Sequence, residues 1–159
     1  MNVKWLALPL LLVGFHACSA EAPPAQAPPA QTAPPPAAAP EANIPRVFFL
    51  EPQDGATVKS PVRVRFRDIG FNIEPVPAGT VTKARPNMGH FHVGTDVDCL
   101  PPATEIPMAN PWIHYGDGKT EEMVMQLTPG AHKLTLQVGD DMHRTVGSLC
   151  STITINVVQ

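Results

Sequence analysis

The sequence predicts an all-β fold, an immunoglobulin-like antiparallel β-sandwich, for residues 44–159, behind a signal peptide and a disordered Pro/Ala tether. In this region apolar residues alternate with polar ones at a period of two, which is typical of half-buried strands. No segment sustains the apolar spacing of an amphipathic helix over three turns. Glycine and proline turns separate about seven short alternating runs, as expected for a single sandwich domain.

Residues 1–18 have the layout of a signal peptide that ends in a lipoprotein-like cysteine. Lys4 is the only charged residue, and an apolar run from Trp5 to Phe15 leads to Cys18. The run is shorter than the about 20 apolar residues that span a bilayer. We therefore expect an exported protein, in the periplasm or at the outer membrane, that a lipid on Cys18 attaches to the membrane. The alternative is cleavage nearby, which would release a soluble periplasmic form.

Residues 19–43 are predicted to be a disordered linker. The stretch contains 10 alanines and 8 prolines and no large apolar residue that could join a core. Proline-rich chains of this kind act as semi-rigid extended spacers. The linker would therefore hold the folded domain away from the membrane.

The charge balance of the folded region argues against nucleic-acid binding. Residues 44–159 contain 10 Lys and Arg and 12 Asp and Glu, which gives no strongly basic surface for phosphate. The phosphate-binding loop, the dinucleotide glycine fingerprint, the serine-hydrolase elbow and the zinc-protease motif are all missing. Because no nucleophile with an adjacent base is found either, we expect a protein that is not an enzyme.

The first half of the domain contains two strands and a turn. Val47–Leu50 is the first strand, and residues 52–55 form the turn. In the second strand three apolar residues would face the core: Val62, Val64 and Phe66. Three arginines would form its solvated face, with a surface for an acidic partner as the alternative: Arg63, Arg65 and Arg67.

The remaining strands follow two long connections rich in proline and glycine, residues 68–86 and 95–111. The predicted strands are 90–93, 112–115, 123–127, 134–138 and 153–157, with a loop at 139–147. Their inward-facing residues alternate: Met123, Met125, Leu127, Leu134, Leu136, Val138, Ile153, Ile155 and Val157. Met108, in the second connection, is also expected to pack rather than to bind metal.

Cys99 and Cys150 are expected to form a disulfide. An even pair of cysteines in an exported protein favours a disulfide over a metal site. Neither cysteine belongs to a Cys-x-x-Cys pair or has an adjacent base, which disfavours reactive-thiol chemistry. A bridge that closes a loop of about 50 residues would contribute about 4 kcal/mol by the chain-entropy relation.

Four histidines form the strongest chemical pattern in the sequence. His90 and His92 share one face of a strand, because side chains two residues apart point the same way. His114 ends a short strand and His143 lies in the 139–147 loop, and loops at one end of a sandwich converge. Imidazole binds both copper and zinc, so we predict a copper or zinc site at these four residues. Two thioethers that would favour cuprous copper are possible additional ligands: Met88 and Met142.

Other polar residues near this pattern have two interpretations. Asp96, Asp117 and Glu121 could orient the ligating imidazoles by hydrogen bonds, or could act as turn formers. His132 follows the corner at Gly130, where sandwich domains often place a side chain that hydrogen-bonds the upstream backbone. We expect His132 to have that role rather than to bind metal.

Five blocks of the sequence resemble the exported bacterial family of domains of unknown function 4399. They are Phe49–Ala56, Met88–His92, His114–Glu121, Pro129–Leu134, and Gly139-Asp140 with His143. Phe91 stands where the family has a third histidine and Lys119 where it usually has glutamine. The resemblance covers residues 44–159 and implies an exported β-sandwich with a histidine-rich end, without an established activity.

The sequence therefore predicts an exported, lipid-anchored β-sandwich protein with a histidine-rich copper or zinc site. The alternative is a non-catalytic structural or adaptor module of the cell envelope, in which the linker presents the sandwich to a protein or a glycan. In that case the histidines would make ordinary polar contacts.

Overall fold

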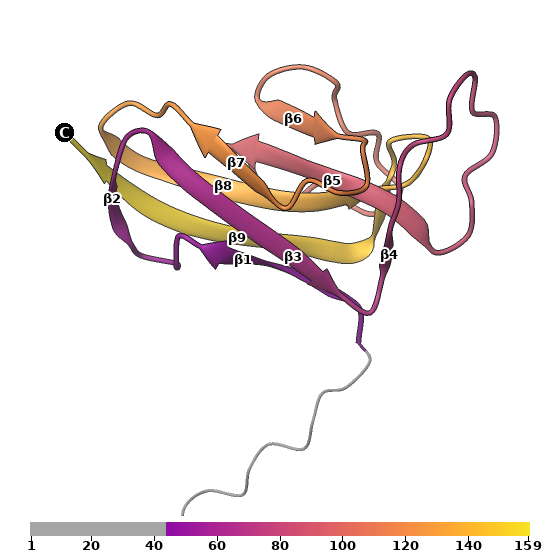
Figure 1. Ribbon diagram of the computed structural model, residues 1–159, viewed down its shortest axis with the longest axis horizontal. Helices are drawn as coiled ribbons and strands as arrows, with labels where there is room; N and C mark the ends of the chain where they lie inside the picture. The colour runs from indigo at the N-terminus through magenta and orange to yellow at the C-terminus, as the bar shows by residue number, and fades with distance from the viewer. Residues whose placement is uncertain (1–43) are drawn as a thin grey trace, which may run out of the picture. The chain divides into compact units, whose positions relative to one another are not determined.

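The computed structural model describes residues 44–159, and this part of the chain consists of β-strands and connections without a helix (Figure 1). The predicted all-β class is confirmed. The strands are β1 (Arg46–Glu51), β2 (Thr57–Lys59), β3 (Val62–Ile69), β4 (Asn72–Ile73), β5 (Met88–Thr95), β6 (Trp112–Tyr115), β7 (Glu122–Met125), β8 (Gly130–Gly139) and β9 (Thr145–Val158). The predicted signal peptide, Cys18 and the predicted linker lie outside the described residues. Within 44–159 no helix is long and apolar enough to cross a membrane.

The strands form two sheets that face each other. One sheet has the order β1-β3-β7, and the other has the order β2-β9-β8-β5-β4 with β6 paired to β5. Figure 1 shows β3 crossing obliquely over the long strands β8 and β9. Phe66 on β3 meets Phe91 on β5 edge to face, with ring centroids 5.1 Å apart. The core therefore lies between the two sheets.

Two short strands depart from the predicted antiparallel arrangement. β2 pairs with β9 in parallel, and β4 pairs with β5 in parallel. β4 also interrupts the connection that was expected over residues 68–86. Strands this short carry too few residues for a visible apolar alternation, so the sequence pattern could not reveal them.

The core residues follow the predicted alternation. On β3, Val62, Val64 and Phe66 are buried. The inward residues of the later strands are buried or packed against the core, as expected: Met123, Met125, Leu127, Leu134, Leu136, Val138, Ile153, Ile155 and Val157. The prediction that Met108 packs is wrong, because the residue is 58% exposed and the connection buries Ile106 instead.

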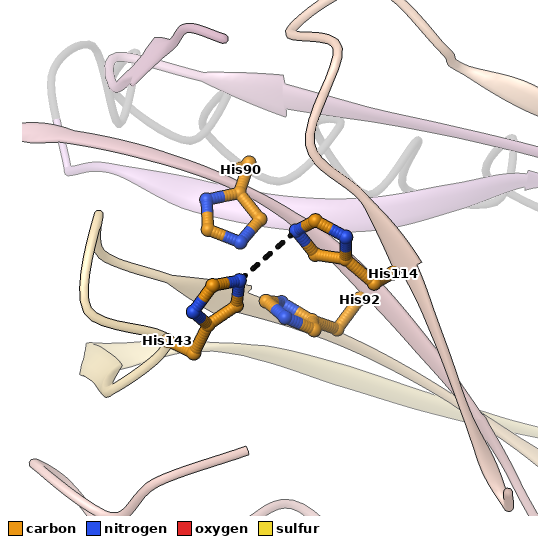
Figure 2. Close-up of side chains that lie close together, drawn as sticks. All are labelled: His90, His92, His114 and His143. Carbon is orange, nitrogen blue, oxygen red and sulfur yellow. Dashed lines mark hydrogen bonds between the residues drawn. The ribbon is translucent and has the colours of Figure 1, made fainter. Parts of the chain in front are cut away.

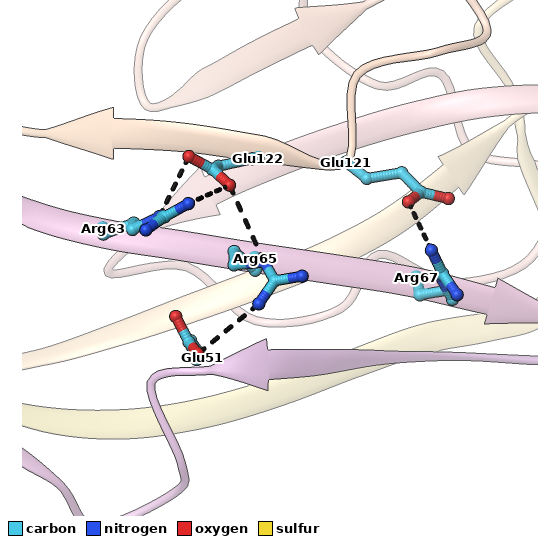
Figure 3. A network of polar contacts seen from close by, with 6 residues as sticks. All are labelled: Glu51, Arg63, Arg65, Arg67, Glu121 and Glu122. Carbon is cyan, nitrogen blue, oxygen red and sulfur yellow. Dashed lines mark hydrogen bonds and ion pairs between the residues drawn. The ribbon is translucent and has the colours of Figure 1, made fainter.

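The arginine face of β3 is exposed and paired with carboxylates on β1, on β7 and just before β7 (Figure 3). Arg63 Nη2 lies 2.7 Å from Glu122 Oε2, and Arg67 Nη2 lies 2.9 Å from a carboxylate oxygen of Glu121. Arg65 bridges two carboxylates at longer range: Glu51 at 3.5 Å and Glu122 at 3.7 Å. The solvated face is confirmed, and these pairs neutralise the charge that an acidic partner would need.

The connection between β5 and β6 covers the outer face of the larger sheet. On β8, Thr135 and Gln137 point away from the core, yet both are fully buried. The Thr135 hydroxyl donates to the Val97 carbonyl, and the Leu100 N–H donates to the Gln137 side-chain oxygen. The middle of this sheet is therefore covered on both faces.

The predicted disulfide is present and fastens this covering connection. The Cys99 and Cys150 sulfur atoms are 1.99 Å apart, and Cys150 lies on β9 directly opposite Gln137 of β8. The bridge joins residues separated by 51 positions. It therefore holds the start of the β5–β6 connection against the outer face of β8 and β9.

Candidate metal centre

β5 places His90 and His92 on the outer face of the larger sheet. Phe91 and Val93, between and after them, belong to the core on the opposite face. The two imidazoles share one side of the strand, as predicted, with ring centroids 4.6 Å apart. Both residues are 0% exposed.

β6 adds His114 by strand pairing. The antiparallel register sets His114 directly opposite His92 and Tyr115 opposite Phe91. Because directly opposed residues point to the same face, Tyr115 turns to the core and His114 turns to the histidine pair. Its ring centroid lies 4.7 Å from that of His90 and 5.1 Å from that of His92.

The β8–β9 loop brings His143 to the same place. β8 ends at Gly139, which lies opposite His90, so the loop begins beside the pair. One carboxylate oxygen of Asp140 accepts hydrogen bonds from the N–H groups of Met142 and Arg144, which fixes the turn. His143 has a φ of 59°. This left-handed conformation costs a non-glycine residue of order 1 kcal/mol, and the surrounding contacts must hold it.

The four rings converge on one point (Figure 2). One nitrogen from each of the four can be chosen so that all lie within 4.8 Å of one another. The Nε2 atoms of His114 and His143 are 3.2 Å apart and form a hydrogen bond. The prediction that distant loops carry His114 and His143 to the His90–His92 pair is therefore confirmed, while metal binding itself stays a prediction.

The two buried rings have no polar partner in the described part of the protein. Both ring nitrogens of His90 and both of His92 are buried without a hydrogen bond. An unsatisfied buried donor or acceptor costs about 1–3 kcal/mol. These residues are therefore not ordinary buried histidines bonded to backbone carbonyl groups.

Burial keeps the imidazoles in the form that binds metals. Burial, together with the smaller effect of charge on neighbouring imidazoles, lowers the pKa of His90 to about 3 and that of His92 to about 2. Burial, followed by repulsion from His143, also lowers the pKa of His114. These three rings are therefore neutral at pH 7, and each keeps a free lone pair on one nitrogen.

Asp141 is a buried carboxylate near the cluster, and the sequence pattern assigned it no role. The Asp141 side chain is 1% exposed and accepts hydrogen bonds from the backbone N–H and the guanidinium of Arg85. Its charge opposes the lowering of the His90 pKa. The Asp140-Asp141 pair next to His143 was visible in the sequence, but nothing there connects it to Arg85, which lies 56 residues away.

The three carboxylates considered as orienting groups make other contacts. Asp96 lies 2.9 Å from His132 Nδ1, Asp117 accepts from the N–H groups of Lys119 and Thr120, and Glu121 pairs with Arg67. The turn-former interpretation is therefore confirmed for Asp117.

His132 lies apart from the four-histidine group. Its Nε2 lies 2.9 Å from the Thr128 carbonyl, which is the upstream backbone contact predicted for the corner.

Met88 lies two residues before His90 and lines a neighbouring cavity of about 350 Å³, and Met142 is half-buried beside His143. Their thioethers as additional ligands stay predictions.

Comparison with known proteins gives one match. The family model described as "Domain of unknown function (DUF4399)" matches residues 64–158, a range that contains all four histidines. No curated protein and no solved structure matches the chain.

Proposed function

Because the chain belongs to the DUF4399 family of domains of unknown function, we propose its function from the histidine cluster: it is a metal-binding protein of the cell envelope. A single copper or zinc ion would lie between four ligands: His90, His92, His114 and His143.

The unpartnered ring nitrogens of His90 and His92 carry this proposal. Polar groups that are buried in folded proteins almost always have a partner. Here two buried rings have unpartnered nitrogens, and one nitrogen of each lies within 4.8 Å of a nitrogen of both further imidazoles. An ion bound at one nitrogen of each ring would supply a partner to both buried residues at once.

Equilibrium dialysis of the full chain against copper and against zinc tests the proposal. We expect one ion per chain, and none in the double variant His90→Ala/His92→Ala. His132→Ala is the matched control, because it removes an imidazole outside the cluster and should leave the stoichiometry unchanged. An unchanged stoichiometry in a folded double variant, or no binding by the unaltered protein, would contradict the proposal.

The envelope location rests on the N-terminal pattern and on the disulfide. The Cys99–Cys150 bridge is consistent with an oxidising compartment. Export with a lipid on Cys18 would place the metal site at the end of a Pro/Ala tether, outside the cytoplasm. Labelling with a radioactive fatty acid tests this: Cys18→Ala should abolish the label, and a label that survives the change would refute the anchor.

We also propose that the two-sheet fold is immunoglobulin-like and that residues 44–159 form one independent domain. The sheet orders β1-β3-β7 and β9-β8-β5 resemble the ABE and GFC strands of that sandwich. The short parallel strand β2, which follows β1 in the chain, then lies on the edge of the opposite sheet beside β9.

A further inference from the structure

We infer that the histidine cluster is a closed, tetrahedral site suited to zinc(II), in which all four positions are filled by imidazole. The inference rests on the proposed metal binding and adds the coordination geometry, the preferred ion and its role. A closed four-ligand site is typical of an ion that stabilises a fold, whereas a catalytic ion keeps one position open.

The distances between the rings carry the tetrahedral geometry. A zinc–nitrogen bond of about 2.0–2.1 Å puts each ring centroid about 3.2 Å from the ion, so all six centroid separations in a regular tetrahedron are about 5.2 Å. The observed separations are 4.6 Å (His90–His92), 4.7 Å (His90–His114), 5.0 Å (His90–His143), 5.1 Å (His92–His114), 5.7 Å (His92–His143) and 4.8 Å (His114–His143). All six lie within about 0.6 Å of the tetrahedral value, five of them below it and one above it.

A square-planar arrangement does not fit these distances. It requires four separations of about 4.5 Å and two diagonals of about 6.4 Å that join different pairs of rings. If His92–His143, at 5.7 Å, were one diagonal, then His90–His114 would be the other, and it is 4.7 Å. The square geometry that copper(II) and nickel(II) favour with nitrogen ligands is therefore disfavoured.

The donor atoms point to the same ion. The group consists of four imidazoles, without a thiolate or a carboxylate. Cuprous copper is also found in tetrahedral sites, but soft sulfur ligands select it. If four imidazoles fill every position, the thioethers of Met88 and Met142 stay outside the coordination shell. Zinc(II) has no geometric preference from its d electrons and accepts imidazole in tetrahedral sites.

Two of the ligands are already at the spacing that the ion needs. Two nitrogens bound to one tetrahedral zinc ion are about 3.3 Å apart, and the Nε2 atoms of His114 and His143 are 3.2 Å apart. Because these two rings are half-buried whereas His90 and His92 are fully buried, the ion would reach the site past His114 and His143. It would replace their mutual hydrogen bond and tie together β5, β6 and the β8–β9 loop.

Cobalt(II) is the probe that tests the geometry, because its visible absorption is strong in tetrahedral sites and weak in six-coordinate ones. The full chain is first freed of metal with a chelator and then titrated with cobalt(II). We expect intense tetrahedral bands that one equivalent of zinc(II) removes, and a thermal midpoint of unfolding that rises on zinc addition. Weak, six-coordinate bands would overturn the inference while leaving metal binding intact. Absence of binding by cobalt, zinc and copper would instead overturn the proposed function.

A single-ligand variant adds an independent readout. His143→Ala should retain cobalt(II) through three imidazoles but change its absorption, because solvent then takes the fourth position. Its zinc affinity should fall by more than the about 10–100-fold loss that removing an outer partner of a metal ligand produces. His132→Ala should change neither property. An unchanged cobalt spectrum in His143→Ala would show that the site is not closed by four histidines.

Discussion

Gly139 lets the ring of His92 lie beside the end of β8. A Cβ atom built at Gly139 would lie 2.6 Å from Cε1 of His92 and 3.1 Å from Cδ1 of Ile106. Both neighbours are fully buried, so neither can move aside freely. We expect Gly139→Ala to destabilise the fold by about 1–3 kcal/mol and to weaken zinc binding by displacing the His92 ring.

Urea unfolding and zinc titration of the same protein measure both effects. Ser148→Ala changes an exposed position on β9 and serves as the control, with an expected change in unfolding free energy within about 0.5 kcal/mol. If a folded Gly139→Ala variant bound zinc with unchanged affinity, the position of the His92 ring would not matter for the site.

The His132–Asp96 contact gives stability a pH dependence away from the cluster. The hydrogen bond that His132 donates to the Asp96 carboxylate raises the pKa of His132. Burial raises the pKa of Asp96, but bonds from the Lys133 N–H and from His132 outweigh it and hold that pKa below its usual value. The stabilisation from His132 is therefore complete below its unfolded pKa of about 6.5 and is lost as pH rises through the raised value. The contribution of Asp96 is lost in the opposite direction, as pH falls below about 4.

Asp96→Asn should accordingly destabilise the protein more at pH 5.5 than at pH 9. Because Asp96 is half-exposed, we expect a difference of only about 0.5 kcal/mol. Denaturant unfolding at the two pH values measures it, with His132→Gln as the partner variant. A cost of Asp96→Asn that did not change with pH would mean that the pair is not charged in the folded protein.

At the scale of the elements, the β5–β6 connection links the disulfide to the histidine cluster. Cys99 lies near its start, and further along the Ile106 N–H donates to the His143 carbonyl at 2.7 Å. The Thr145 N–H donates to the Thr104 carbonyl at 2.9 Å. The connection therefore lies against the β8–β9 loop and supports the left-handed backbone of His143.

Loss of the disulfide should lower both stability and zinc affinity. The variant Cys99→Ser/Cys150→Ser should lose about 2–4 kcal/mol of unfolding free energy, because the unfolded chain gains freedom. Its zinc affinity should fall because the connection holds His143 less firmly. Denaturant unfolding in the presence of a chelator gives the first quantity and zinc titration the second. Full affinity in the destabilised variant would show that His143 is held without the disulfide.

The sequence pattern predicted a strand well where one of its faces is buried and the other is exposed along its whole length. β3 alternates cleanly because Val62, Val64 and Phe66 face the core and the arginines face water. The alternation on β5 is also visible, but it did not reveal the burial of the histidine face. The segments that meet this face, β6 and the β8–β9 loop, come together only in the folded chain. The expected 139–147 loop was too long, since β9 begins at Thr145 by continued pairing with β8.

The candidate site was predictable as a set of residues but not in its environment. The period of two is enough to bring His90 and His92 together, and turn positions suggested His114 and His143. The burial of the first two, the buried Asp141–Arg85 pair and the space left by Gly139 depend on contacts between distant segments. Such contacts follow from the assembled topology, which a local pattern does not contain.

At the scale of the whole molecule, the histidine cluster and the core share one strand. Phe91 packs on Phe66 between the sheets, while His90 and His92 on either side of it face the cluster. The three segments that carry the ligands meet only in the folded chain, so an ion bound by all four imidazoles would bind the folded state far better than the unfolded one. Metal binding must then stabilise the fold by linkage.

Residues 44–159 alone should show this linkage in full. At free zinc of 100 times Kd, their unfolding free energy should rise by about 2.7 kcal/mol, and by nothing in His90→Ala/His92→Ala. The full chain should gain the same amount, because all four ligands and the core lie within 44–159. Denaturant unfolding with and without zinc measures the gain in each protein. If the zinc-dependent rise in unfolding free energy disappeared when residues 1–43 are removed, the N-terminal segment would contribute to the site. An equal rise in the double variant would mean that the stabilising ion binds elsewhere.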